Sequence, residues 1–254
     1  MRSRRVRTTW PVWNLLFGRF ACFGELAFSS GRHPAWSVGT ALRLDGLCLV
    51  ELARRYDPQF QSLRGRGFSA YSGSPENEWG IFLGGVWKPR KRMKLEANLN
   101  RYGRICPENA RALPLRGEHA RFRLTHRLNQ TLSLRLSFES QLETLSETRT
   151  RRHVRTDLSW SDDRSRLQVW GERSWLSAFD EGGSGLASGI NLRRGGQTGF
   201  QVALWEAIYT ISAYEARIYA FVPSVWGGSQ LLTLTGRGYA GGPRLGWGGK
   251  RSRV

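Results

Sequence analysis

The histidines and serines are the residues from which this chain could assemble a catalytic or metal site. None of the histidine pairs has the i, i+4 spacing that places two zinc ligands on one face of a helix. His126 could act as the base of a membrane-embedded hydrolase if a serine lay beside it on a neighbouring strand, but no Gly-x-Ser-x-Gly elbow accompanies it. The serine candidates are Ser133, Ser137 and Ser159. We therefore predict no metal, no cofactor and no enzymatic activity for this chain.

The cysteines are odd in number and widely spaced, at Cys22, Cys48 and Cys106. Such a set excludes a disulfide framework and a Cys-x-x-Cys metal knuckle. The chain also contains no window of about 18 uncharged apolar residues, so the sequence predicts no transmembrane helix. A role in the membrane would need β-strands instead.

The charge of the chain is strongly basic. Its 39 Lys and Arg residues outnumber 20 Asp and Glu residues, which gives a formal net charge of +19. The densest basic run is residues 88–94, KPRKRMK, which could bind phosphate groups or form a charged turn between two strands. Basic side chains also suit the anionic groups of outer-membrane lipid and the lining of a large pore. The charge therefore leaves nucleic-acid binding open as an alternative.

Apolar residues recur at every second position through most of the chain. This is the period of a β-strand with one apolar face. Leu132, Leu134, Leu136 and Phe138 show it most clearly, because a polar residue separates each from the next. Residues 93–99 repeat the pattern, and no segment shows the period of an amphipathic helix. The sequence therefore predicts an all-β protein.

We predict about 14 strands, a number within the range of outer-membrane barrels. Their approximate spans are 15–29, 35–45, 47–56, 78–88, 93–102, 120–128, 131–142, 151–161, 165–175, 185–194, 197–209, 213–222, 230–240 and 243–250. Most are about nine to twelve residues long, the length of a tilted strand that crosses a bilayer. Short turns such as Asp45-Gly46 alternate with longer connections such as 57–77 and 103–119, although this alternation weakens after residue 210. Outer-membrane barrels show the same asymmetry between their two rims.

Tryptophan residues lie mostly near the ends of the predicted strands, as in the aromatic girdle of a membrane barrel. They are Trp36, Trp79, Trp87, Trp160, Trp175, Trp205, Trp226 and Trp247. Together with the strand lengths and the alternating connections, they favour an antiparallel up-and-down transmembrane β-barrel over a soluble all-β fold. We expect residues 1–14 to form a basic, poorly ordered N-terminal segment and residues 15–254 to form the barrel domain, whole or partial.

Four short motifs occur in a fixed order along the chain. They are FGELA at 23–27, RRYDPQF at 54–60, NEWGIFLG at 77–84 and YEARIYAF at 214–221. In this order they resemble a family of bacterial outer-membrane β-barrels often encoded behind a helix-hairpin-helix module of the competence type. The resemblance implies that the chain corresponds to the C-terminal barrel region, and that the helix-hairpin-helix module is not part of it. It also implies structural roles for the motif residues Asn77, Glu78, Gly80, Gly84, Arg217 and Tyr219.

In a barrel of this kind the polar positions of each strand line the lumen. The candidate lumen residues are Arg43, Arg135, Glu139, Arg155 and Asn191. The predicted function is that of a non-enzymatic scaffold or pore component in the bacterial outer membrane. Its predicted partners are outer-membrane lipid and either further barrel strands or an upstream periplasmic module. Two alternatives stay open: a soluble basic all-β protein that binds nucleic acid, and a barrel-embedded hydrolase.

Overall fold

The computed structural model describes residues 11–29, 33–60, 69–70, 76–106, 116–144, 148–178, 182–195, 199–223 and 229–248. Within these ranges the chain is all-β, apart from the short 3-10 helix η2 (Tyr214–Ala216). The first eight strands are β1 (Val12–Phe17), β2 (Phe20–Phe28), β3 (Pro34–Leu44), β4 (Leu47–Tyr56), β5 (Glu78–Arg90), β6 (Met93–Gly103), β7 (Arg116–Arg127) and β8 (Leu132–Thr144). The others are β9 (Thr148–Ser161), β10 (Ser165–Ser177), β11 (Gly182–Arg194), β12 (Gly199–Ile211), β13 (Ile218–Pro223), β14 (Ser229–Leu234) and β15 (Gly236–Gly248). No helix in the described part is long and apolar enough to cross a membrane.

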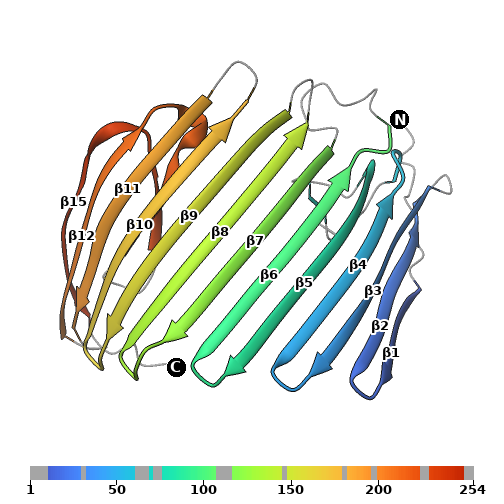
Figure 1. Cartoon of the computed structure of the whole chain (residues 1–254), viewed down its shortest axis with the longest axis horizontal. Coiled ribbons are helices and arrows are strands. Elements are labelled where there is room, and N and C mark those ends of the chain that lie inside the picture. Colours follow the sequence, from blue (N-terminus) through green and yellow to red (C-terminus); the bar gives the residue numbers. More distant parts are fainter. Residues whose placement is uncertain are drawn as a thin grey trace. The chain divides into compact units, whose positions relative to one another are not determined.

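The strands form one 13-stranded sheet and one two-stranded sheet (Figure 1). In the larger sheet the strand order follows the chain from β1 to β12 and then passes to β15, while β13 pairs with β14. Paired strands run antiparallel, so the predicted antiparallel up-and-down architecture is confirmed. The chain divides into two compact units. Unit 1 comprises Met1–Arg90, Leu95–Phe122 and Gln141–Thr148, and unit 2 comprises Lys91–Lys94, Arg123–Ser140 and Arg149–Val254.

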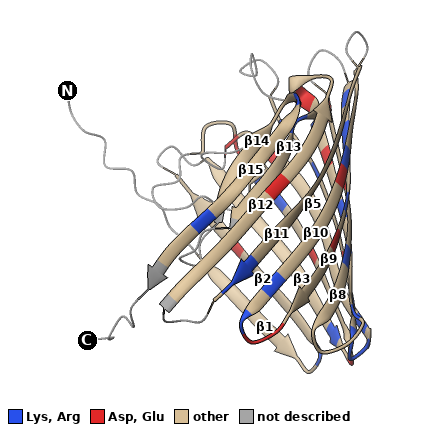
Figure 2. Ribbon diagram, turned by 90° about the vertical axis from the view of Figure 1, so that its left-hand side faces the viewer, with Lys and Arg blue, Asp and Glu red and all other residues tan. Residues whose placement is uncertain are grey.

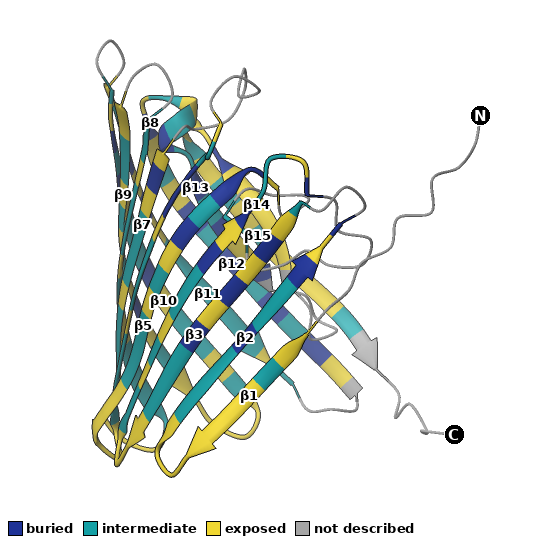
Figure 3. Cartoon of the chain, turned by 90° about the vertical axis from the view of Figure 1, so that its right-hand side faces the viewer, coloured by how far each residue is buried: buried dark blue, intermediate teal, exposed yellow. Residues whose placement is uncertain are grey.

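The strands carry large hydrophobic side chains on one face, and these side chains are exposed. In β3, buried and exposed residues alternate from Pro34 to Gly39, and the exposed positions include Trp36 and Val38 (Figure 3). Further strands repeat the exposed row, with Ile81 and Leu83 in β5, Leu136 and Phe138 in β8, Val154 and Leu158 in β9, Val169 in β10, Leu186 in β11 and Ile208 in β12. We call this side the apolar face. The opposite side, called the polar face, carries polar and small residues together with a few buried large ones such as Trp170 and Trp205.

The single strand predicted for residues 15–29 was wrong, because this range contains the end of β1, a turn and β2. Gly18 has a φ of +59°, and the turn that it forms with Arg19 brings Phe17 opposite Phe20. Glycine adopts this left-handed conformation without steric cost. The apolar residues around it concealed the turn in the sequence pattern. β1 begins at Val12, within the segment predicted to precede the barrel domain, and residues 1–10 lie outside the described residues.

The C-terminal strands also differ from the predicted spans 213–222, 230–240 and 243–250. Residues 214–216 form η2, so β13 begins only at Ile218, and β14 ends at Leu234. β15 then runs without a break through Pro243 and through Gly241 and Gly242, which were predicted to form a turn between two strands. Proline is tolerated in an end strand because its missing N–H can face away from the neighbouring strand. β15 lies at the end of the strand order.

Each unit has its own buried cluster. In unit 1 a small cluster is formed by Ala27, Ala35, Tyr56 and Phe60, with the Tyr56 and Phe60 rings stacked at a centroid distance of 6.5 Å. In unit 2 the cluster lies where η2 and the β13–β14 hairpin meet the polar face of the sheet. Its members are Trp170, Ala187, Trp205, Ala207, Ile211, Ala216, Ile218, Ala220, Val222 and Leu234.

Candidate functional site

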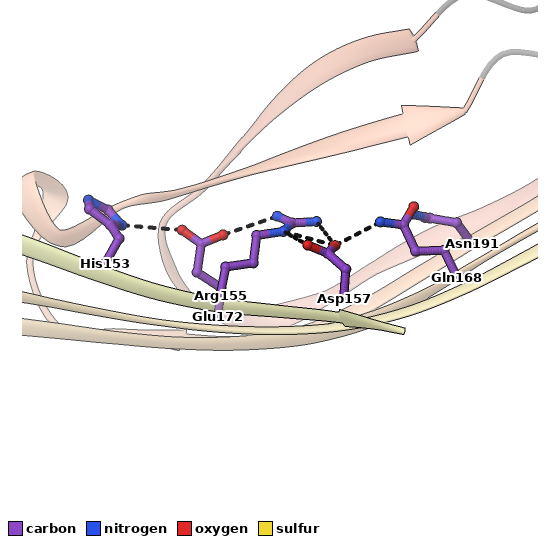
Figure 4. Close-up of polar contacts among 6 residues, drawn as sticks. All are labelled: His153, Arg155, Asp157, Gln168, Glu172 and Asn191. Atoms are coloured by element: carbon purple, nitrogen blue, oxygen red, sulfur yellow. Dashed lines mark hydrogen bonds and ion pairs between the residues drawn. The ribbon is translucent and has the colours of Figure 1, made fainter. Parts of the chain in front are cut away.

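A row of hydrogen-bonded polar side chains lies on the polar face of β9, β10 and β11 in unit 2 (Figure 4). Alternation along each strand turns these side chains away from the apolar face. The antiparallel register then sets Arg155 opposite Glu172, and Gln168 opposite Asn191. The set, called the polar row below, consists of His153, Arg155, Asp157, Gln168, Glu172 and Asn191.

Arg155 is the centre of the polar row. Its Nη1 donates to Glu172 Oε2 at 3.1 Å, while its Nη2 and Nε donate to Asp157 Oδ1 at 3.0 and 3.1 Å. The guanidinium also lies 4.7 Å from the ring centroid of Trp170, a cation–π arrangement. The side chains are largely buried, with exposed fractions of 20% for Arg155, 5% for Asp157 and 10% for Glu172. Two partly desolvated carboxylates thus share one fixed cation.

The ends of the polar row extend the hydrogen bonds in both directions. His153 Nδ1 lies 3.2 Å from Glu172 Oε1. At the other end Gln168 Nε2 donates to Asp157 Oδ1 at 2.7 Å, and Asn191 Nδ2 donates to Gln168 Oε1 at 3.2 Å. The carboxylates therefore accept hydrogen bonds from several fixed donors. These hydrogen bonds hold the side chains in fixed positions. A general acid or base, in contrast, needs a carboxyl group that can exchange its proton with a substrate.

On the polar face of unit 2, basic residues outnumber acidic ones. Figure 2 marks the positions of Lys, Arg, Asp and Glu along the strands. By their alternation with the exposed apolar rows, the basic residues of this face are Arg123, Arg127, Arg135, Arg149, Arg151, Arg155, Arg166, Arg193 and Arg244. The acidic residues placed there by the same criterion are Glu139, Asp157 and Glu172. Since these nine arginines outnumber the three acidic residues, this face carries an excess of positive charge.

The structure brings together some of the predicted lumen residues. Arg155 and Asn191 both belong to the polar row. Arg135 and Glu139 lie on β8 in the same unit, outside the row. Arg43 lies in unit 1, where it is exposed near the end of β3. Sequence reasoning missed the other four members of the row. Their alternation was visible in β9 and β10, but the pairing depends on strand register.

The predicted hydrolase set is not assembled. His126 shares its side of β7 with the exposed Phe122, whereas Ser159 shares its side of β9 with Asp157. Ser133 and Ser137 alternate with the exposed Leu136 and so turn to the polar face of β8. The histidine and the serines thus lie on opposite faces. Among the described residues there is also no group of three His, Cys, Asp or Glu side chains that could hold a metal ion.

Two of the sequence motifs meet in unit 1 at a buried ion pair. Arg54 Nε of β4 donates to Glu78 Oε1 of β5 at 2.7 Å, and neither side chain has exposed surface. Arg54 Nη1 also donates to Asn100 Oδ1 of β6 at 3.1 Å. Gly80 leaves room for the guanidinium, because a Cβ at this position would overlap it. Glu78 also accepts a hydrogen bond from Ser69 Oγ at 2.6 Å, which ties the connection before β5 to this pair.

Asn77 ties a second long connection to the same end of β5. Its side chain accepts hydrogen bonds from the backbone N–H groups of Ile105 and Cys106 at 3.1 and 2.8 Å, and donates to Cys106 O at 2.8 Å. Asn77 has a φ of +50°, a conformation that asparagine tolerates better than most residues. The predicted structural residues Asn77 and Glu78 therefore each fasten a connection. Gly84 lies further along β5, beside the Phe82 ring.

The remaining predicted structural residues lie at the start of the β13–β14 hairpin. Arg217 Nε donates to Tyr219 Oη at 2.6 Å. The guanidinium carbon also lies 4.4 Å from the ring centroid of Tyr214 and 5.7 Å from that of Tyr219. Arg217 therefore holds two aromatic side chains together at the base of the hairpin.

Comparison with protein-family models and with curated proteins identified no relative of this chain. No protein-family model matches the chain, and no curated protein matches it. The resemblance to outer-membrane β-barrels therefore stays a prediction from the sequence motifs.

Proposed function

We propose that this chain forms a β-barrel in the bacterial outer membrane, where it acts as a scaffold or pore component without enzymatic activity. One observation carries the proposal. Large hydrophobic side chains are exposed at alternate positions of most strands, and the opposite face holds a polar network. A soluble sheet buries its apolar face against another layer, whereas a membrane barrel presents that face to lipid. Outer-membrane lipid is therefore the proposed partner of the apolar face.

The lengths of the strands support this proposal. β5, β8, β10, β11, β12 and β15 each contain 13 residues. A tilted strand of about 9–11 residues crosses the hydrocarbon core of a bilayer. The additional residues can extend into the headgroup regions.

In this proposal the polar face lines the lumen. The polar row fixes part of the lining, and the arginines around it attract anions. In hydrocarbon, the outermost strands of the larger sheet need partners, because backbone N–H and C=O groups cannot stay unpaired there. We therefore propose further β-strands as partners for the outer edges of β1 and β15. An upstream periplasmic module is a further proposed partner.

Refolding the full chain in parallel into detergent micelles and into detergent-free buffer tests the proposal. Far-UV circular dichroism and the gel mobility of heated and unheated samples would be recorded for both. We expect a β spectrum and a heat-sensitive mobility shift in detergent only. A cooperative β fold in plain buffer would contradict the proposal and direct attention to the alternative of a soluble basic protein. Salt-dependent binding of nucleic acid would then be the next assay, because the net charge of +19 favours such a partner.

A further inference from the structure

The chain between β12 and β15 is an insertion into an otherwise direct hairpin. β12 and β15 are neighbours in the larger sheet, and their register sets Ile211 opposite Gly236. The described residues between these two strands form η2, β13 and β14 outside the larger sheet. Because Ile211 and Gly236 already face each other, the sheet does not need the residues between them. The insertion can therefore serve a role separate from the sheet.

The β13–β14 hairpin packs against the polar face of the sheet. Ile218 and Ala220 have no exposed surface, and Leu234 is 1% exposed. They share a buried cluster with Ala187 of β11 and Ala207 of β12. On the hairpin's other side, Phe221 and Leu231 face each other and remain 57% and 53% exposed. The hairpin thus has one face that is fitted to the sheet.

Small residues of β11 make room for the insertion. A Cβ at Gly185 would lie 2.5 Å from Ser174 Oγ and 2.7 Å from the carbonyl oxygen of Ala216. A Cβ at Gly183 would lie 2.7 Å from the Ala213 Cβ. Any larger side chain at these positions must therefore displace the base of the insertion. This close approach explains why glycine occupies both positions.

Hydrogen bonds fasten the base of the insertion to the sheet. Ser174 Oγ of β10 donates to the carbonyl oxygen of Ala216 at 2.5 Å, and Arg151 Nη2 of β9 donates to that of Arg217 at 2.9 Å. Ser212 Oγ accepts from the Ser184 N–H at 2.8 Å. These anchors all lie at residues 212–217, before the hairpin strands begin.

The packing is looser at the other end of the hairpin. A cavity of about 400 Å³ lies there, lined by Val222, Gln230 and Leu232 of the hairpin and by Trp205 and residues 241–244 of the sheet. Arg244 Nη2 donates to Gln230 Oε1 across this region at 3.3 Å. The insertion is therefore fixed at its base and less closely packed beside Gln230 and Leu232.

We propose that η2 and the β13–β14 hairpin form a displaceable plug that restricts passage along the polar face of the sheet. This inference rests on the proposed function, in which the polar face lines a lumen. The plug occupies this face beside β10, β11 and β12, and its fixed base serves as the pivot. Displacement of the hairpin exposes Ile218, Ala220 and Leu234 and opens the lumen.

Two variants and a matched control test the plug through conductance. In the first variant an Asn-Gly turn replaces residues 212–235, since this pair favours a tight hairpin turn and preserves the Ile211–Gly236 register. The second variant, Gly185→Val, displaces the base. Gly171→Val serves as the control, because a Cβ at Gly171 meets nothing within 4 Å. In planar bilayers we expect single-channel conductance to rise on the order of twofold or more for both variants, because it follows the open pore width. The control should match the wild type.

A labelling experiment tests the packing without relying on a pore. Cys22, Cys48 and Cys106 are first replaced by serine, and Ala220→Cys is then exposed to a water-soluble maleimide in folded protein. We expect slow labelling that becomes fast when Gly185→Val is added, while Phe221→Cys labels fast in both backgrounds. Slow labelling at Ala220→Cys together with equal conductance in wild type and deletion would overturn the plug and leave the pore standing. Folded wild type and deletion that both lack conductance would overturn the pore, and the plug with it.

Discussion

Arg54 and Glu78 show how single residues hold this fold together. Their side chains are fully buried, and Glu78 also accepts a hydrogen bond from Ser69 Oγ. A buried ion pair of this kind costs much to desolvate, so it contributes mainly when both partners are present. Because the pair joins the end of β4 to the start of β5, it is a fastening point for the connection between them.

We expect Arg54→Gln to lower the free energy of unfolding by about 3–5 kcal/mol, because Glu78 then keeps an uncompensated buried charge. Urea unfolding of the refolded protein measures this loss. Arg55→Gln is the matched control, since Arg55 is exposed on the opposite face of β4. Adding Glu78→Gln to Arg54→Gln should recover part of the loss by removing the unpaired charge. Equal losses for Arg54→Gln and Arg55→Gln would contradict this role.

Asp162, in the turn between β9 and β10, gives a prediction for pH dependence. The backbone N–H groups of Arg164 and Ser165 donate to its carboxylate at 2.8 and 2.6 Å and hold its pKa below the ordinary value. Its contribution to stability is therefore complete above the unfolded-state pKa of about 3.9 and is lost as the pH falls through the lower folded-state pKa. The stability difference between wild type and Asp162→Ala should stay constant from about pH 7 to pH 5 and shrink below about pH 4. A difference that grows on acidification would contradict the assignment, and Asp163→Ala is the control from the same turn.

At the scale of elements, the period-two pattern predicted the strands where polar and apolar residues alternate strictly. The predicted span 93–102 begins with β6 at Met93 and ends one residue before it. The pattern failed at residues 15–29, because the turn at Gly18 lies inside an apolar run, and near Pro243, because an end strand tolerates residues that otherwise signal turns. Alternation also predicted Arg155 as a polar-face residue. It could not predict Arg155's partners, since these depend on which residues of β10 lie opposite β9.

The two faces of β8 allow a direct comparison of neighbouring positions. Phe138 is 39% exposed on the apolar face, and Ser137 lies on the polar face. In a membrane barrel, Phe138→Arg should lower stability by about 2–4 kcal/mol near the middle of the bilayer, while Ser137→Arg has a small effect. Urea unfolding of protein folded in lipid vesicles measures both. An exposed site in water would tolerate either change, so equal stability of the two variants would contradict the lipid-facing assignment.

At the scale of the whole molecule, the proposal accounts for two properties together: the exposed apolar face and the basic composition. In this proposal lipid covers the apolar face, and the arginines of the polar face set the field within the lumen. Such a lumen concentrates anions, because charge of one sign in a confined polar space focuses the electrostatic potential.

The reversal potential in a potassium chloride gradient should therefore show selectivity for chloride. Arg135→Glu should reduce this selectivity, because it reverses a charge on the polar face of β8. Arg164→Glu makes the same charge change in the exposed turn between β9 and β10, and we expect a smaller shift. Cation selectivity in the wild type would contradict the electropositive lumen.

The most direct test of the central claim is the accessibility of nitroxide labels along β8 in protein reconstituted into lipid vesicles. Single cysteines would be placed at Leu134, Arg135, Leu136, Ser137, Phe138 and Glu139 in a background without the native cysteines. Electron paramagnetic resonance then compares collisions with oxygen, which is enriched in the bilayer, and with a water-soluble nickel chelate. We predict a period of two, with oxygen favoured at 134, 136 and 138 and nickel favoured at 135, 137 and 139. Nickel accessibility at 136 and 138 equal to that of their neighbours would contradict a lipid-facing strand.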